Sequence, residues 1–153
     1  MVPVDHYAKD LADGIDDALP RWVERCVRNV MVAWHGDLPA GVAEAAEAAG
    51  ARAADEIGRQ ARDLLDADID EQRQTPLTLV RAAVRYPTEV LAAAGAPPTE
   101  RDDFVARAFP ADVYGLSPAS WAEVDPALTD PGLAWGASKA FAHKRRHAAG
   151  GRR

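Results

Sequence analysis

The sequence predicts an all-α fold, an irregular orthogonal bundle of about seven helices in which long helices precede short, proline-capped ones. Three observations support this class. Apolar residues recur at steps of three and four along most of the chain, which is the spacing of one face of an α-helix. Segments end at glycines or open at a Ser, Thr or Asp followed by proline, the usual signals of helix ends. No segment shows the alternation that is typical of a β-strand.

Two helices are expected before residue 36. The first spans residues 4–18 and carries an apolar stripe of Val4, Tyr7, Leu11, Ile15 and Ala18. Pro20 has no backbone N–H and suits a first helical turn, so it is expected to open a second helix. That second helix has a wide apolar face, including Cys26 and Trp34, and ends at Gly36 in a left-handed cap. So wide an apolar face predicts a central position in the fold.

A long Ala-rich helix is expected over about residues 39–73. Its small side chains bury little area each, but they let a neighbouring backbone approach closely. High helix propensity and pairs such as Asp55 with Arg59 add support. The next helical segment, over residues 75–95, is interrupted by Pro87, which is expected to displace the preceding residue from helical angles. A kink or two short helices are therefore predicted there.

The C-terminal half is expected to contain short helical segments. Thr99 and Asp102 form a capping-box pattern for a helix that ends at Pro110. A cap residue followed by proline opens a turn over residues 117–121, and the same pattern opens a final helix over residues 130–141.

Length and charge together predict one domain with a basic tail. The chain has 153 residues, enough for one core, so residues 1–141 are assigned to a single helical domain and residues 142–153 to a disordered tail. Residues 139–153 hold six Lys or Arg and no acid, whereas the rest of the chain holds 12 basic and 24 acidic side chains. A body this acidic repels nucleic acid, which leaves any attraction for phosphates to the tail.

The sequence also predicts a cytoplasmic location. The N-terminal segment is acidic and lacks the basic start and apolar core of a secretory signal. Apolar stretches are only a few residues long, far short of the roughly 18 that a membrane span needs. A single cysteine excludes an internal disulfide and agrees with a reducing compartment.

One acidic stretch partly matches a calcium-binding loop. Asp66, Asp68 and Asp70 occupy the first, third and fifth positions of that pattern. The sixth position is Glu71 where the turn needs glycine, and the twelfth is Leu77 where a bidentate glutamate is needed. A solvated acidic helix end is therefore the preferred interpretation.

Two further patterns have simpler explanations than a functional site. His143 and His147 have the spacing of a metal pair on one helix face, but the three basic residues between them oppose a divalent cation. Cys26 lies near arginines that lower a thiol pKa, yet its place on the apolar face predicts burial instead. No metal and no cofactor is expected.

An anion or ligand contact is a weaker candidate on the segment around Pro87. Arg81, Arg85 and Tyr86 are placed to grip a carboxylate or phosphate, although a surface ion pair of Arg85 with Glu89 explains the same pattern. An enzymatic site would combine them with Asp102 and Asp103, and all five side chains would then have to meet in one cavity.

The basic tail is the candidate contact for nucleic acid or an acidic partner. The residues assigned to that contact are Lys144, Arg145, Arg146, Arg152 and Arg153. Several phosphates are neutralised by such a set in a salt-sensitive way. No aromatic residue follows Phe141, so the tail offers no stacking surface and no sequence-specific recognition is expected.

Part of the chain resembles known sequences. The stretch DIDEQRQTPLTLVRAAVRYPTEVLAAAGAPP, followed by RDDFVARAFPADVYGLSPASWAEVDPAL and PGLAWGASKA, covers about residues 64–141 and resembles a set of uncharacterised proteins of actinobacteria. The resemblance implies a bacterial cytoplasmic protein, and it carries no activity, cofactor or catalytic residue.

The function expected first is a non-enzymatic helical adaptor or regulatory protein that binds another protein and forms a homodimer. The alternative is a nucleic-acid-associated protein that uses its basic tail. A second alternative is an enzyme or small-molecule binder with a site around Arg81, Arg85 and Asp102. No membrane contact is expected.

Overall fold

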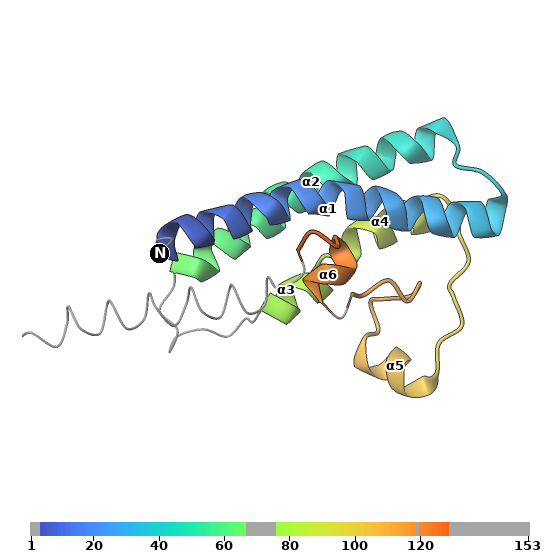
Figure 1. Cartoon of the computed structure of the whole chain (residues 1–153). Helices are drawn as coiled ribbons and strands as arrows, with labels where there is room; N and C mark the ends of the chain where they lie inside the picture. The colour runs from blue at the N-terminus through green and yellow to red at the C-terminus, as the bar shows by residue number, and fades with distance from the viewer. Residues whose placement is uncertain (1–3, 67–75, 119, 129–153) are drawn as a thin grey trace, which may run out of the picture.

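The computed structural model describes residues 4–66, 76–118 and 120–128, and all regular structure within them is helical (Figure 1). The helices are α1 (Val4–His35), α2 (Ala40–Asp66), α3 (Pro76–Ala82), α4 (Arg85–Ala93), α5 (Asp103–Ala108) and α6 (Trp121–Val124). The all-α class is thus confirmed for this part of the chain. The final helix expected over residues 130–141 and the tail of residues 142–153 lie outside it.

The two longest helices, α1 and α2, lie side by side and run in opposite directions (Figure 1). Gly36 ends α1 with φ 89°, and its N–H donates to the carbonyl of Val32 at 3.0 Å, so the predicted left-handed cap is confirmed. For this pair the expected orthogonal packing is wrong. The buried side of α2 consists of small residues except for Ile57, and small side chains let the two helices approach closely.

The expected boundary at Pro20 is also wrong, because α1 continues through this residue as one helix of 32 residues. Pro20 removes one hydrogen bond from the helix, which costs stability. The apolar stripe nevertheless continues on both sides of it, and Ile15, Leu19 and Val23 are fully buried. Burial of both halves against the same neighbours offsets the missing bond. Gly50 of α2 leaves room for the proline: a Cβ there would lie 2.9 Å from Pro20 Cα.

The core lies between α1, α2 and α4, with α3 and α6 contributing from the side. Its largest fully buried side chains include Ile15, Leu19, Met31, Ile57, Leu79 and Leu91. Cys26 is buried among them, as its position on the apolar face predicted. None of the helices in the described ranges is long and apolar enough to cross a membrane.

The segment around Pro87 forms two short helices, one of the two outcomes expected, but the break precedes the proline by several residues. Helix α3 ends at Ala82 and α4 begins at Arg85, so Pro87 lies in the first turn of α4. Amides of a first turn have no partner within the helix, so a proline is tolerated there. Tyr86 keeps helical geometry, contrary to expectation, and its N–H donates to the carbonyl of Ala83 at 3.2 Å.

Helix α5 begins later than the capping-box pattern indicated. Its N-cap is Asp102, whose carboxylate accepts a hydrogen bond from the Val105 amide at 2.9 Å. Thr99, the expected cap, instead donates its amide to the carbonyl of Val113 at 3.0 Å. This bond joins the two ends of residues 99–113, the segment that contains α5. Helix α5 lies apart from α1 and α2 (Figure 1). Helix α6 follows Ser120, so the pair at residues 117–118 does not open it directly.

Candidate functional site

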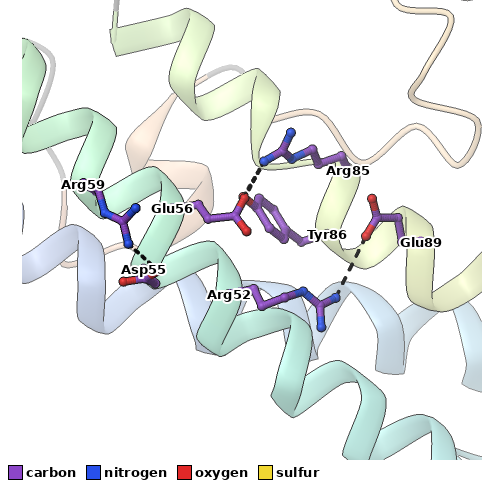
Figure 2. A network of polar contacts seen from close by, with 7 residues as sticks. All are labelled: Arg52, Asp55, Glu56, Arg59, Arg85, Tyr86 and Glu89. Atoms are coloured by element: carbon purple, nitrogen blue, oxygen red, sulfur yellow. Dashed lines mark hydrogen bonds and ion pairs between the residues drawn. The ribbon is translucent and has the colours of Figure 1, made fainter.

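The polar cluster that contains two predicted contact residues lies where α4 passes α2 (Figure 2). Arg85 and Tyr86 follow each other in the first turn of α4, and Glu56 projects from α2 toward both. Arg85 donates to Glu56 Oε2 at 2.6 Å and to the Tyr86 hydroxyl at 2.8 Å. The hydroxyl donates in turn to Glu56 Oε2 at 2.6 Å. The three side chains therefore form a closed triangle.

Burial and charge in this triangle keep the tyrosine neutral. Loss of solvent around the ring, followed by the hydrogen bond to Glu56, raises the Tyr86 pKa above its ordinary value. The hydrogen bond that Arg85 donates to the Tyr86 hydroxyl, with the charge of Glu56, raises the pKa of Arg85 as well. The guanidinium also lies 4.8 Å from the centre of the Tyr86 ring, within cation–π distance. The neutral phenol, the guanidinium and the carboxylate thus hold one another in place across α2 and α4.

Neighbouring ion pairs extend the cluster along α2 (Figure 2). Arg52 lies 3.9 Å from Glu89 of α4, and Arg59 lies 2.8 Å from Asp55, which confirms the predicted pair on α2. The predicted pair of Arg85 with Glu89 is wrong. Helix α2 lies beside α4, so charged side chains of α2 compete for Arg85 with Glu89, which lies one turn away on α4. Arg85 bonds to Glu56 of α2.

The other residues proposed for a binding or enzymatic site have separate roles. The Arg81 guanidinium stacks over the Phe109 ring at 4.6 Å from its centre. Asp102 caps α5, and Asp103 lies exposed in the first turn of that helix. Of these residues, Arg85 and Tyr86 contact each other, whereas Asp102 is the N-cap of α5.

The sequence pattern predicted neither Glu56 as a partner of Arg85 and Tyr86 nor the ion pairs between α1 and its neighbours. Arg62 of α2 contacts Asp16 and also Asp13, the latter at 3.3 Å. Arg21 of α1 pairs with Asp125, which follows α6. These partners are 46 to 104 residues apart in sequence. Periodicity indicates which face of a helix is polar, but it contains no signal for the partner of a particular charge.

Other candidate sites are either buried or outside the described residues. Burial raises the pKa of the Cys26 thiol to about 12, so the thiol stays protonated and unreactive at neutral pH. Within the ranges that the structure describes, no three His, Cys, Asp or Glu side chains are grouped to hold a metal ion. Most of the acidic stretch at residues 66–70, the histidine pair at 143 and 147, and the basic tail lie beyond those ranges.

A shallow, open depression lies on the surface between α1 and α2. It is lined by Asp16, Ala54, Asp55, Arg59 and Arg62. Its carboxylates and guanidiniums bond to one another, so the lining is balanced in charge and has no dominant attraction for a ligand of either sign.

Comparison of the chain with protein-family models, with curated proteins and with solved structures finds no match.

Proposed function

We propose that the chain is a non-enzymatic helical adaptor that binds another protein through the closed end of the α1 and α2 pair. The observation that supports this most is apolar exposure in the last turn of α1. Val32 is 47% exposed and Trp34 is 44% exposed, and Trp34 belongs to the wide apolar face that the sequence predicted for this segment. Leu38 and Val42, which follow in the connection and in the first turn of α2, are only half-buried.

A partner protein gains more binding free energy from covering the end of α1 at Trp34 than from contacting the polar cluster around Glu56. A Trp side chain buries about 150 to 250 Å² when it is fully covered, so roughly 100 Å² of Trp34 is left to bury. At about 25 cal/mol per Å² this is worth about 2 kcal/mol. Aromatic residues of this kind are enriched among interface residues that contribute most to binding. The charges around Glu56, by contrast, already have partners, and a ligand must displace them.

Two other aromatic residues, Tyr86 and Tyr114, lie beside a proline and a glycine in the sequence and are alternative candidates for interface anchors. Both are buried, at 2% and 5% exposure, and the Tyr114 hydroxyl donates to the carbonyl of Ala96 at 2.8 Å. They pack in the core, so the proposal rests on Trp34 instead.

The test is recovery of tagged protein from its native cells, comparing the parent chain with a Val32→Ser/Trp34→Ser variant. Phe104→Ser is the matched control, because Phe104 is 77% exposed on α5 and its replacement also removes an exposed apolar group. We expect one protein to accompany the parent and the control but not the double variant. Equal recovery with all three chains, while circular dichroism shows the fold intact, would contradict the proposed surface.

The second candidate function is association with nucleic acid through the basic tail, and the separation of charge along the chain favours it. Removal of residues 142–153 tests this alternative at low and moderate salt. Nucleic acid lost on truncation or with rising salt would support it, because contacts to phosphates release counterions. A protein retained by both the truncated and the full chain would support the adaptor.

A further inference from the structure

One stripe along the second half of α1 combines basic side chains with apolar exposure. Its members follow one another at steps of four and three residues, so they share one side of the helix. All of them are exposed: Arg21, Arg25, Arg28, Val32 and His35. None is an aspartate or a glutamate. The stripe is therefore a row of basic groups that ends beside the exposed apolar end of α1.

The first two positions of the stripe bind a segment of the same chain. Arg25 donates to the carbonyl oxygens of Val124 and Glu123 at 2.7 and 3.2 Å, at the C-terminal end of α6. One turn earlier on α1, Arg21 pairs with the carboxylate of Asp125. Figure 1 shows α6 beside the middle of α1. Free carbonyl oxygens at a helix end carry partial negative charge, so both arginines hold negative groups of the docked segment.

The next position of the stripe is open. Arg28 is exposed, and in the described part of the chain its guanidinium forms neither an ion pair nor a hydrogen bond, not even with Glu24 one turn earlier. It lies three residues beyond Arg25, about 4.5 Å further along the helix axis. An unpaired guanidinium thus stands next to two that already hold negative groups.

Exposed apolar groups adjoin Arg28 on the side toward the end of α1. Val32, one turn later, is 47% exposed. His35 follows after one more turn, and its ring lies beside that of Trp34, with the ring centres 5.5 Å apart. The imidazole already has a carboxylate neighbour, since Asp37 lies 3.5 Å away. From Arg28 to His35 the stripe extends over about 10 Å, which is the length of roughly two turns of a docking helix.

From this continuity and this charge we infer that the partner docks on the end of α1 with an acidic segment, in which a carboxylate pairs with Arg28 and a neighbouring apolar side chain covers Val32 and Trp34. The segment has the chemistry of Glu-Val-Asp at residues 123–125, which the same stripe binds one turn away. A basic segment is disfavoured there by like charge. This inference rests on the adaptor proposal and adds the chemistry of the partner surface.

Two labelled peptides test this chemistry on the full chain. The first is a short helical peptide of leucines and glutamates, and the second has glutamine in place of each glutamate. Fluorescence anisotropy at low salt measures the affinity of each peptide for the parent and for Arg28→Gln. We expect Arg28→Gln to weaken binding of the glutamate peptide about two- to fivefold and to leave the glutamine peptide unaffected, which is the signature of a direct charge pair.

The matched control is Arg107→Gln, which removes one exposed charge from α5 and should change neither affinity. A glutamate peptide that carries a benzophenone beside its central leucine should cross-link to residues 28–35, and mass spectrometry locates the product. Circular dichroism checks that each variant folds. Equal effects of Arg28→Gln on both peptides, cross-links only elsewhere on the chain, or no binding of either peptide would overturn the inference.

Two further outcomes separate this inference from the adaptor proposal and from another occupant. If both peptides bind equally well and only Val32→Ser/Trp34→Ser abolishes binding, the end of α1 recognises apolar groups alone, so the acidic partner is wrong and the adaptor stands. If a single-stranded oligonucleotide binds with the same dependence on Arg28, the stripe recognises phosphates, and the assignment to an acidic protein segment is overturned. The recovery experiment with tagged protein decides the adaptor proposal separately.

Discussion

Replacement of Gly50 by alanine should destabilise the fold, although the same change stabilises most helices. In an open helix, alanine is more favourable than glycine by about 0.5 to 1 kcal/mol, because glycine loses more backbone freedom on folding. At Gly50 a Cβ would lie 2.9 Å from Pro20 Cα and 3.1 Å from the Pro20 carbonyl oxygen. Both are backbone atoms of α1, so relief of the overlap requires the two long helices to separate.

The expected magnitude follows from these opposing effects. Forcing an extra carbon into a well-packed contact costs about 1 to 3 kcal/mol. After subtraction of the helix-propensity gain, Gly50→Ala should lower the free energy of unfolding by about 0.5 to 2 kcal/mol. Urea denaturation followed by circular dichroism measures this change. With a slope of about 1 to 3 kcal/mol per M, the midpoint should fall by several tenths of a molar while the slope stays constant.

Gly41→Ala is the matched control in the same helix. Gly41 is exposed, and nothing lies within 4 Å of a Cβ built there, so only the backbone effect remains. Its midpoint should equal or exceed that of the parent. A Gly50→Ala variant as stable as Gly41→Ala would show that α2 does not pack against the backbone of Pro20.

Three further predictions concern single groups. Gly58→Ala should lower the stability of the parent protein, because a Cβ at Gly58 overlaps the Asp16 carboxylate. In an Asp16→Ala background, where that carboxylate is gone, the same change should raise stability. Denaturation of the parent, the two single variants and the double variant measures both effects. Because the folded-state pKa of Tyr86 is raised, its stabilising effect is complete below the unfolded value of about 10 and is lost as pH rises through the folded value. This would be confirmed if the Tyr86→Phe variant did not show the loss of stability in that pH range. Cys26 should react with a thiol reagent at pH 8 only as fast as the chain unfolds, whereas rapid reaction of the folded protein would contradict its burial and its pKa of about 12.

Helix class and the buried face could be predicted because both depend on local pattern. The stripe through Leu11, Ile15 and Ala18 is buried as its spacing requires, and Cys26 is buried on the continuation of that face. Residues at helical spacing share one side of a helix whatever lies opposite. Any arrangement that covers this side satisfies the pattern, so the antiparallel packing of α1 and α2 could not be inferred from it.

Two prolines show where local rules are overruled or shifted. Pro20 was predicted to begin a helix, but apolar burial on both sides keeps α1 continuous through it. Pro87 was expected to displace Tyr86 from helical angles, and instead the chain breaks earlier, so that Pro87 falls in the first turn of α4. Pro20 costs a hydrogen bond inside α1, whereas the position of Pro87 in a first turn avoids that cost. The position of the break depends on which residues have to reach the core.

Partners of charged residues could not be predicted for a related reason. Arg85 has Glu89 four residues later on its own helix, and this pair was predicted from spacing alone. An exposed pair of that kind contributes only about 0.3 to 0.5 kcal/mol. Such a small preference gives way once α2 brings Glu56 to within 2.6 Å, where the Tyr86 hydroxyl adds a second hydrogen bond to the same carboxylate. Long-range contacts of this sort decide the polar network, and the sequence pattern does not contain them.

The two exposed aromatic side chains, Phe104 and Trp34, differ in how the surrounding structure holds their backbone. Phe104 belongs to a segment closed by the bond from Thr99 to Val113, and α5 has no buried residue, so Phe104 is presented without support from the core. Trp34 lies in the last turn of α1, and the preceding turns are packed into the core through Val27 and Met31. This packing fixes the backbone at Trp34. Ordering a side chain on a fixed backbone costs less entropy on binding than ordering a separate segment. For equal apolar area, the end of α1 is therefore the better anchor for a partner, and Phe104→Ser is the appropriate control for it.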